Sequence, residues 1–210
     1  MNPELESYLL EHMDEEPALL KELNRYTQAH VLSPRMMSGP LQGRLLSFFS
    51  KMIRPENILE IGTYTGYGTL CLAEGLPEGG HIHTIEINDE IVHIARHFFE
   101  KAGLENQISL HIGSALSVIP TLDKPFDLVY LDADKSQYCD YFRLVFDKVR
   151  KGGYILADNT LWNGLVIREQ DLRDKSGKGI LAFNEMIKKD LRIEKVILPV
   201  RDGLTLIRKI

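Results

Sequence analysis

The chain has 210 residues, of which 44% are hydrophobic, and this is enough for one α/β domain with a substantial core. Its 25 basic and 30 acidic side chains give a formal net charge of −5, so bulk charge does not attract it to nucleic acid or to an anionic membrane. No apolar run reaches the length of a bilayer span, residues 1–16 lack a signal-peptide pattern and two cysteines are too few for a disulfide scaffold, so we expect a cytoplasmic protein with no membrane partner.

Residues 1–55 precede the first predicted strand. The segment 4–30 predicts two helices around an acidic stretch that ends at Pro17, a residue suited to the first turn of a helix. Leucines in the second helix form an apolar stripe that must pack against the main domain or against another subunit. Residues 32–40 contain prolines and a glycine and predict a loop before the next helix. We therefore expect one domain over residues 1–210, with residues 1–55 as a cap or dimerisation region.

Residues 57–68 predict a strand, a glycine-rich loop and the approach to a helix that begins at Leu70. The apolar run at the start is typical of a buried parallel strand. Gly62 and Gly66 allow the backbone to approach a nucleotide-like ligand closely. Glu60 would repel a pyrophosphate but suits the ammonium and sulfonium groups of S-adenosylmethionine. The glycine spacing also departs from the Gly-x-Gly-x-x-Gly fingerprint of dinucleotide sites.

The rest of the chain alternates strands with helices, which predicts a mainly parallel sheet with helices on both faces. Strands are predicted at residues 81–86, 108–112, 126–131 and 154–157, and helices at 89–102, 138–146 and 180–189, with a short helix that ends at residue 119. The polar segment 160–178 predicts a mobile loop at the mouth of a site. Residues 192–200 and 204–208 predict a hairpin, which adds an antiparallel strand.

Acidic residues end four of the predicted strands: Glu60, Glu86, Asp132 and Asp158. Ligands of parallel sheets bind beyond the carboxyl ends of the strands, so this coincidence of position predicts a site. Glu86 is suited to accept hydrogen bonds from both ribose hydroxyls, and the alternative is a solvated loop carboxylate. The small residues 113–115 leave room for the adenine ring.

Asp132, Asp158 and Asn159 offer oxygen ligands without nitrogen or sulfur, a set that suits magnesium, manganese or calcium better than zinc. Helix capping is the simpler interpretation of an Asp-Asn pair, but acids from adjacent strands beside Lys135 favour a metal. A cation would make a bound hydroxyl easier to deprotonate and would push Lys135 toward its neutral form, so that Lys135 could act as general base. The oxyanion would then attack the methyl group of the sulfonium in line.

Five segments in residues 30–210 carry a resemblance to known enzymes: MSGPLQG (37–43), LEIGTYTGY (59–67), LDADKSQY (131–138), ADNTLWNG (157–164) and LPVRDGLT (198–205). Together they resemble the cation-dependent O-methyltransferases of the caffeoyl-CoA and catechol type. The glycine-rich motif alone indicates a class I methyltransferase, and the Asp-Ala-Asp-Lys and Asp-Asn-x-Leu-Trp motifs narrow the resemblance to this family. It implies a Rossmann-like class I methyltransferase sheet, S-adenosylmethionine, a divalent cation and a homodimer.

The resemblance also implies a role for each matching residue. Asp132, Asp158 and Asn159 would bind the metal, and Lys135 would be the general base in a catalytic pair with Asp132. The cofactor site would be formed by Met37, Ser38, Glu60, Gly62, Thr63, Gly68, Glu86, Ala115, Asp132 and Asp134. Trp162 and Tyr138 are the candidate substrate contacts. Gly68 departs from the family pattern, in which serine is common, so backbone contacts would replace a side-chain hydrogen bond to the cofactor.

We predict a methyltransferase that acts on one of two adjacent hydroxyls of a catechol-like small molecule, whose neighbouring oxygens would chelate the cation. The less favoured alternative is a tRNA methyltransferase acting on a hydroxyl of a wobble uridine. The sequence Gly164-Leu165-Val166 and a basic rim favour that alternative, and the net charge opposes it; the rim consists of Arg168, Arg173, Lys175 and Lys178. A nicotinamide-dependent oxidoreductase is disfavoured by Glu60 and the glycine spacing. A non-enzymatic binding protein is disfavoured by the presence of both the cofactor acids and the metal set.

Overall fold

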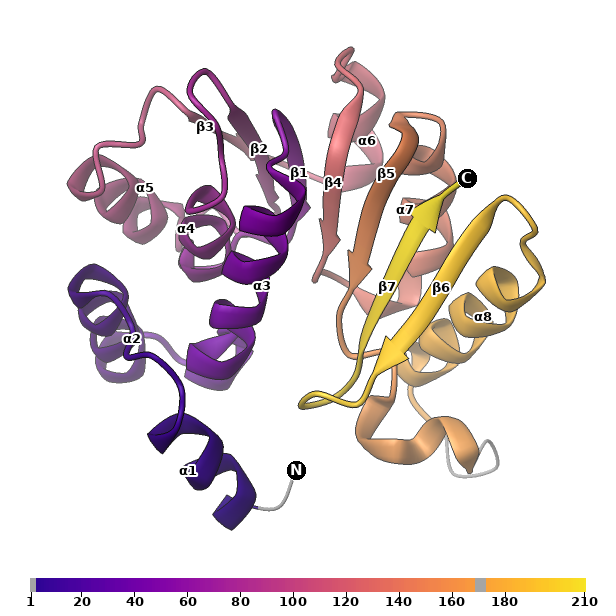
Figure 1. Ribbon diagram of the computed structural model, residues 1–210, viewed down its shortest axis with the longest axis horizontal. Helices are drawn as coiled ribbons and strands as arrows, with labels where there is room; N and C mark the ends of the chain where they lie inside the picture. The colour runs from indigo at the N-terminus through magenta and orange to yellow at the C-terminus, as the bar shows by residue number, and fades with distance from the viewer. Residues whose placement is uncertain (1–2, 169–172) are drawn as a thin grey trace. The chain divides into compact units, whose positions relative to one another are not determined.

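The computed structural model describes residues 3–168 and 173–210 (Figure 1). Its strands are β1 (Asn57–Ile61), β2 (His81–Glu86), β3 (Ile108–Ile112), β4 (Phe126–Leu131), β5 (Val149–Ala157), β6 (Ile193–Leu198) and β7 (Leu204–Lys209). They form one seven-stranded sheet with the hydrogen-bonded order β3-β2-β1-β4-β5-β7-β6. The pairs β2–β3, β1–β4 and β4–β5 are parallel, whereas β7 is antiparallel to both β5 and β6. The predicted Rossmann-like α/β sheet with an antiparallel C-terminal strand is confirmed.

Two compact units divide the chain. Unit 1 contains the residues up to Glu56 together with Thr63–Gly113, and unit 2 contains Asn57–Gly62 with Ser114–Ile210. The single domain and the cap region expected from the sequence stay predictions. Within the described part of the chain, no helix combines the length and the hydropathy that a bilayer span requires.

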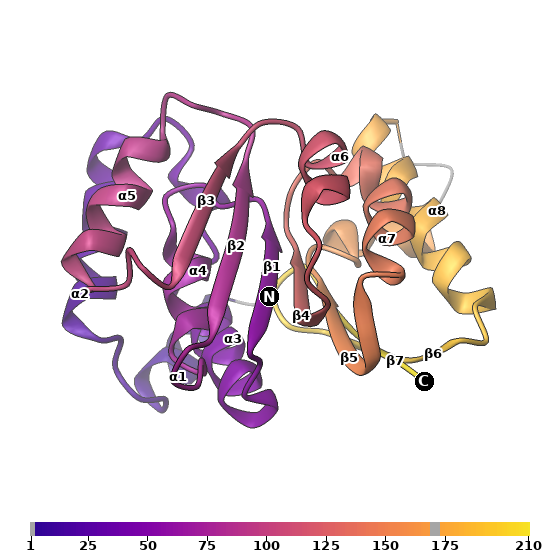
Figure 2. The same cartoon turned by 90° about the horizontal axis from the view of Figure 1, so that it is seen from above.

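Unit 1 holds the N-terminal helices and the strands β2 and β3. Its helices are α1 (Pro3–Glu11), α2 (Ala18–His30), the 3₁₀ helix η1 (Pro34–Met36), α3 (Gly39–Ile53), α4 (Tyr67–Ala73) and α5 (Val92–Lys101). The helices α4 and α5 lie on the same side of β2 and β3 (Figure 2). Ala95, Phe98 and Phe99 recur at helical spacing in α5 and are buried, so this helix is amphipathic.

Two helices of unit 1 begin elsewhere than predicted. The helix α4 begins at Tyr67 instead of Leu70, because Gly66 at φ +89° turns the chain and its carbonyl accepts the Leu70 N–H at 3.0 Å. The helix α5 begins at Val92 instead of residue 89. The reason is a turn in which the Asn88 side chain accepts the Glu90 N–H at 3.1 Å.

The helices α3 and α4 pack closely because glycine occupies the contact. A Cβ atom on Gly43 would lie 2.6 Å from Tyr67 Cε1 and 2.8 Å from Cys71 Sγ. Another on Gly75 would lie 2.1 Å from the backbone carbon of Ser50. Real Cβ atoms do not make such contacts, so a larger residue at either position would separate the two helices.

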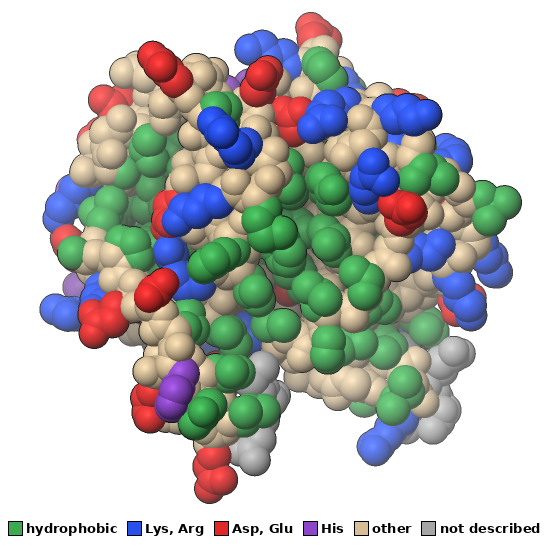
Figure 3. Space-filling view, viewed as in Figure 1, with side chains coloured by type: hydrophobic (Ala, Val, Ile, Leu, Met, Phe, Trp, Pro, Cys, Tyr) green, Lys and Arg blue, Asp and Glu red, His purple; other side chains and the backbone are tan. Residues whose placement is uncertain are grey.

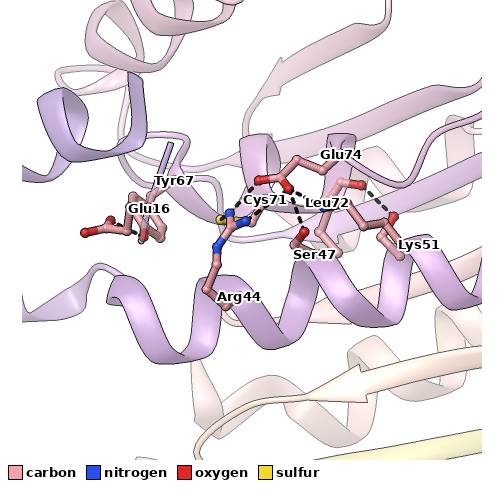
Figure 4. A network of polar contacts seen from close by, with 9 residues as sticks. Glu16, Arg44, Ser47, Lys51, Tyr67, Cys71, Leu72 and Glu74 are labelled. Carbon is pink, nitrogen blue, oxygen red and sulfur yellow. Dashed lines mark hydrogen bonds and ion pairs between the residues drawn. The ribbon is translucent and has the colours of Figure 1, made fainter. Parts of the chain in front are cut away.

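A polar network joins α3 to α4 in unit 1 (Figure 4). The Glu74 carboxylate accepts hydrogen bonds from both terminal nitrogens of Arg44, at 2.5 and 3.1 Å, and from Ser47 Oγ and Lys51 Nζ, each at 2.7 Å. Burial alone would raise the pKa of Glu74, but the hydrogen bonds from Arg44, Lys51 and Ser47 outweigh it and lower the pKa to about 2. The side chains of Arg44 and Glu74 are 12% and 23% exposed, so solvent screens this pair only in part.

Glu74 is therefore expected to make stability depend on pH. A carboxyl group whose pKa falls on folding stabilises the fold above its unfolded pKa and loses that effect as pH falls through its folded pKa. We expect Glu74→Gln to lower the free energy of unfolding by about 2–3 kcal/mol at neutral pH, and the difference from wild type to vanish between about pH 4.5 and pH 2. Urea titrations at several pH values measure this difference. The variant Glu78→Gln, at an exposed position, is the control.

Unit 2 contains β1, β4 to β7 and the C-terminal helices. Beside its strands it has α6 (Ala115–Val118), η2 (Ile119–Thr121), η3 (Lys135–Gln137), α7 (Tyr138–Phe146), η4 (Trp162–Ile167) and α8 (Lys175–Lys189). The helices α6, α7 and α8 lie on one side of β4, β5, β7 and β6 (Figure 2). Ile58, Leu59, Leu128 and Val129 are fully buried in β1 and β4, as expected of apolar parallel strands.

Two elements of unit 2 are longer than predicted. The strand β5 begins at Val149 instead of Tyr154, because Val149 already pairs with Phe126 and the intervening residues form an irregularity before Tyr154 pairs with Leu128. The helix α8 begins at Lys175 instead of residue 180, where the Asp174 carboxylate caps it by accepting the Gly177 N–H at 2.7 Å.

The predicted loop 160–178 is therefore partly helical. Residues 162–167 form η4, and α8 takes up its last residues. Residues 169–172 lie outside the described residues, and the mobility of the loop stays a prediction.

Candidate functional site

Asp132 and Asp158 lie at the carboxyl ends of neighbouring strands in unit 2. The backbone N–H of Asp132 donates to the Ile61 carbonyl at 2.9 Å, and that of Asp158 donates to the Leu131 carbonyl at 3.0 Å. The parallel hydrogen-bond ladder thus continues one residue beyond β4 and β5. It fixes the backbone of both acids, as the prediction from strand ends requires.

The side chains of these two acids lie near the Tyr130 hydroxyl, and Lys135 contacts the first of them. Lys135 Nζ lies 2.7 Å from Asp132 Oδ1, and Lys135 and Asp132 are 14% and 15% exposed. The Tyr130 hydroxyl lies 3.3 Å from Asp132 Oδ2 and 3.5 Å from Asp158 Oδ2. Asp158 is 4% exposed. We call Tyr130, Asp132, Lys135 and Asp158 the acid–lysine cluster.

Tyr130 is a member of this cluster that sequence reasoning missed. Its position in an apolar run predicts only a strand residue of the core, and it is buried, with 1% of its surface exposed. A signal was present, since residues two apart in a strand point to the same face and Tyr130 precedes Asp132 by two positions. Its single O–H lies near both carboxylates and can donate to one of them at a time.

Asn159 follows Asp158 directly, and its place among the metal ligands stays a prediction. Its backbone is left-handed, with φ +58°, and its N–H donates to Asp158 Oδ1 at 2.8 Å. Within the residues that the structure describes, no three His, Cys, Asp or Glu side chains form a metal-binding group. A cation at this place would therefore have two carboxylates and one amide as protein ligands. Such a set fits a hard divalent cation that keeps water or substrate oxygens as its other ligands.

Tyr138 does not face outward, and its contact with substrate stays a prediction. It is fully buried, and its hydroxyl lies 2.8 Å from the Leu131 carbonyl and 3.1 Å from the Asp158 carbonyl. Burial raises the pKa of its phenol well above the ordinary value, and the nearby charges of Asp132 and Asp158 raise it further. Tyr138 thus supports the ends of β4 and β5 from within the core.

Gly62 is required for a reason that the sequence did not reveal. It has φ +102°, and a Cβ atom there would lie 2.2 Å from the Asp132 carbonyl oxygen. We predicted that glycine here lets the backbone approach a ligand. It also lets the backbone of Gly62 approach the backbone of Asp132. Gly66 is similar, because a Cβ atom would lie 2.7 Å from Phe99 in unit 1.

Two further cofactor candidates of unit 2 are buried, and a third caps a short helix. Glu60 is 1% exposed and Ala115 is 6% exposed. Asp134 caps η3, since its carboxylate accepts the Ser136 N–H at 2.9 Å and the Ser136 hydroxyl at 2.8 Å. The contact of Asp134 with the methionine moiety stays a prediction.

In unit 1, Glu86 is held by backbone amides. Its carboxylate accepts the Tyr64 N–H at 2.7 Å and the Asn88 N–H at 2.9 Å, and the residue is 8% exposed. Carboxylate oxygens can accept more than one hydrogen bond each, so this arrangement leaves acceptor capacity for ribose hydroxyls. The Thr63 hydroxyl lies 2.5 Å from that of Thr84 and thus contacts β2.

The loop before α3 is tied to the glycine-rich loop, a connection that sequence reasoning missed. Tyr64 has φ +51°, and its hydroxyl donates to the Ser33 carbonyl at 2.9 Å. Met37 and Ser38, which we expected to close over a cofactor, are 5% and 8% exposed. Gly68 is buried in the first turn of α4. The cofactor contacts of these three residues stay predictions.

Comparison with known proteins gives a consistent result. A family model described as O-methyltransferase matches residues 10–210. Caffeoyl-CoA O-methyltransferase 5 of Nicotiana tabacum is 37% identical over 206 residues, which cover 93% of this chain and 85% of that protein. An O-methyltransferase of Bacillus cereus in complex with SAH superposes with a TM-score of 0.91 at 30% identity, covering 99% and 97% of the two chains. TomG of Streptomyces achromogenes, an O-methyltransferase in complex with SAM, superposes with a TM-score of 0.90 at 28% identity, covering 100% and 99%.

Proposed function

This chain belongs to the O-methyltransferase family and is an S-adenosylmethionine-dependent enzyme, and from that premise we propose its acceptor and its cation. The proposed reaction transfers the methyl group of S-adenosylmethionine to one hydroxyl of a catechol-like small molecule. Asp132, Asp158 and Asn159 would hold a divalent cation, magnesium or alternatively manganese or calcium. The observation that carries this proposal is the acid–lysine cluster at the ends of β4 and β5.

The residues of the cluster have distinct roles in the proposed reaction. A divalent cation, when bound, supplies Lewis acidity that makes an acceptor hydroxyl more acidic. Lys135 Nζ takes the proton of that hydroxyl, and Asp132 at 2.7 Å stabilises the resulting ammonium. The buried Tyr130 hydroxyl donates to one of the two carboxylates at a time. The half-buried position of Asp132 and Lys135 limits water at the reacting oxygen, which favours attack by an anion on a sulfonium.

A tRNA acceptor is the second candidate, because one observation favours it. Four basic residues that follow η4 in the chain are exposed: Arg168, Arg173, Lys175 and Lys178, the last two in the first turn of α8. Four cations so close in the sequence would contact phosphates. The overall charge of −5 opposes this reading, so we keep the small phenol as the proposed acceptor.

We also propose a homodimer as the working form. Figure 3 shows hydrophobic side chains gathered over the strands of unit 2. Large apolar side chains are exposed in both units: Leu5 and Tyr8 in α1, Phe48 and Met52 in α3, and Val196 and Ile197 in β6. A second copy of the chain would cover such side chains, and their burial would stabilise the dimer. Sedimentation that gives only the monomer mass would contradict this. A cytoplasmic location stays a prediction.

Methyl transfer to two acceptors side by side tests the proposed function. Labelled S-adenosylmethionine and magnesium are supplied with a panel of catechols and, separately, with bulk tRNA that lacks the wobble modification. We expect rapid labelling of a catechol and none of tRNA. Labelling of tRNA with only slow catechol turnover would show an RNA-modifying enzyme instead.

A further inference from the structure

The segment that follows the proposed metal ligands has an unusual backbone. Asn159, Trp162 and Asn163 have φ values of +58°, +47° and +54°. Residues with a Cβ atom rarely adopt this left-handed conformation, and such residues persist only where their surroundings hold them. Gly164 follows at φ +74°. The backbone conformation at Trp162, and with it the direction of its side chain, is thus held by contacts with other parts of unit 2.

The β6–β7 turn supplies most of that support. The Asp202 carboxylate accepts the backbone N–H of Asn163. The Asp202 carbonyl accepts the Leu161 N–H at 2.9 Å, and the Gly203 carbonyl accepts the Thr160 N–H at 3.0 Å. Three hydrogen bonds therefore join residues 160–163 to residues 202–203, and the one to Asn163 depends on a side chain.

Two further contacts hold the start of the segment. Thr205 Oγ1 donates to Thr160 Oγ1 at 2.8 Å in the core, and Asn184 Nδ2 of α8 donates to the Thr160 carbonyl at 2.8 Å. The turn and the segment also touch directly, since a Cβ atom on Gly203 would lie 2.8 Å from the Leu161 nitrogen. The start of the segment is thus held by several groups, whereas its end at Asn163 is held by Asp202.

The Trp162 side chain lies near Asp174, the residue that caps α8. The Asp174 carboxylate accepts the Gly177 N–H at 2.7 Å, and this bond is the main cause of the lowered pKa of Asp174, to which the Trp162 side chain adds. The backbone that follows the indole is bound at Asn163. An aromatic ring whose backbone is held in this way is a preorganised surface, which reduces the entropy lost on ligand binding.

We propose that Asp202 is a positioning residue for the methyl acceptor, which acts through the Asn163 backbone to hold Trp162 in place. The inference rests on the proposed function, because it assumes that Trp162 contacts a planar aromatic acceptor. Burial raises the pKa of Asp202, and the positive charge of the nearby Lys135 partly opposes that rise. An effect through charge on Lys135 is the rival explanation, and the experiment must separate the two.

The variants Asp202→Ala and Asp202→Asn separate them. Alanine removes both the hydrogen bond to Asn163 and the charge, whereas asparagine removes the charge but keeps an oxygen that can accept the Asn163 N–H. Asp190→Ala is a matched control, since Asp190 lies in the same unit and binds Arg192. The chain contains one tryptophan, so its fluorescence reports on Trp162 alone.

We expect Asp202→Ala to raise the KM for a catechol acceptor by about 10–100-fold, with a smaller change in kcat, as is common when a supporting contact is lost. The Trp162 emission should shift toward that of exposed indole, and its quenching by the acceptor should weaken. The dissociation constant of S-adenosylmethionine should not change. Asp202→Asn should restore the emission, the quenching and most of the acceptor KM.

Three results would overturn the inference: wild-type emission and KM in Asp202→Ala, failure of Asp202→Asn to restore them in folded protein, or an equal effect of Asp190→Ala. If the alanine variant does not fold, Asp202→Ser replaces it, because its polar side chain is too short to reach the Asn163 N–H. Failure of the proposed function looks different, since wild-type protein would then show neither catechol turnover nor quenching by catechols.

Discussion

The variant Asp158→Ala is expected to lose methyl transfer to catechols while its affinity for S-adenosylmethionine stays close to that of wild type. Asp158 is 4% exposed, and its carboxylate, like that of Asp132, lies near the Tyr130 hydroxyl. Its loss would leave one carboxylate and one amide for a divalent cation, a set too weak to hold it at physiological concentration. Titration with Mn²⁺ followed by electron paramagnetic resonance should show the loss of the tight site without any assay of activity.

Two controls make this prediction specific. Asp140→Ala removes an exposed carboxylate of α7 that pairs with Arg143, and it should bind Mn²⁺ and turn over as wild type does. Chelator treatment of wild-type protein should reproduce the Asp158→Ala phenotype, and added magnesium should reverse it. Undiminished turnover in chelator would contradict the proposed cation.

The variant Lys135→Met should lower the rate of methyl transfer by about 10²–10⁴-fold, which is the usual contribution of a general base. Methionine has a similar length and cannot take a proton. Without the base, the rate should depend on the fraction of acceptor that is already ionised. The rate of the variant should therefore keep rising with pH where that of wild type has levelled off. For the same reason, the loss should shrink for catechols whose hydroxyl has a lower pKa.

Measurements of kcat/KM against pH, with acceptors of different acidity, test the role of Lys135. Lys188→Met is the control, since Lys188 is exposed in α8 and pairs with Glu185. An equal loss for every acceptor at every pH would indicate that Lys135 contributes to structure or binding and not to proton transfer.

The sequence alone identified the elements of this fold because their signals are local. The apolar runs at β1 and β4 and the hairpin of β6 and β7 depend on neighbouring residues. The errors lie at element ends. Val149 joins β5 because the distant Phe126 is available to pair with it, and no local pattern identifies that partner. The start of α8 at Lys175 is set by a local cap, Asp174, which the interpretation of residues 160–178 as a loop overlooked.

Part of the candidate site was also predicted from the sequence. Asp132, Asp158 and Lys135 were expected to lie together, because residues at the carboxyl ends of adjacent parallel strands must lie at one edge of the sheet. The surroundings of Tyr138 could not be predicted, because an aromatic residue beside a motif looks the same whether its hydroxyl meets a ligand or, as here, the Leu131 and Asp158 carbonyls. No role for Asp202 follows from the sequence, since its partner Asn163 is distant in the chain.

What the sequence by itself determined is the order of the strands along the chain and the chemical type of the groups at their ends, because periodicity and residue identity are properties of the chain alone. The tertiary structure decided which groups meet: Lys135 with Asp132, Tyr130 with both carboxylates, and Gly62 with the Asp132 backbone. Contacts of that kind depend on register and packing distance. Both are set by the fold as a whole, and a change of one residue in register would point each side chain to the opposite face.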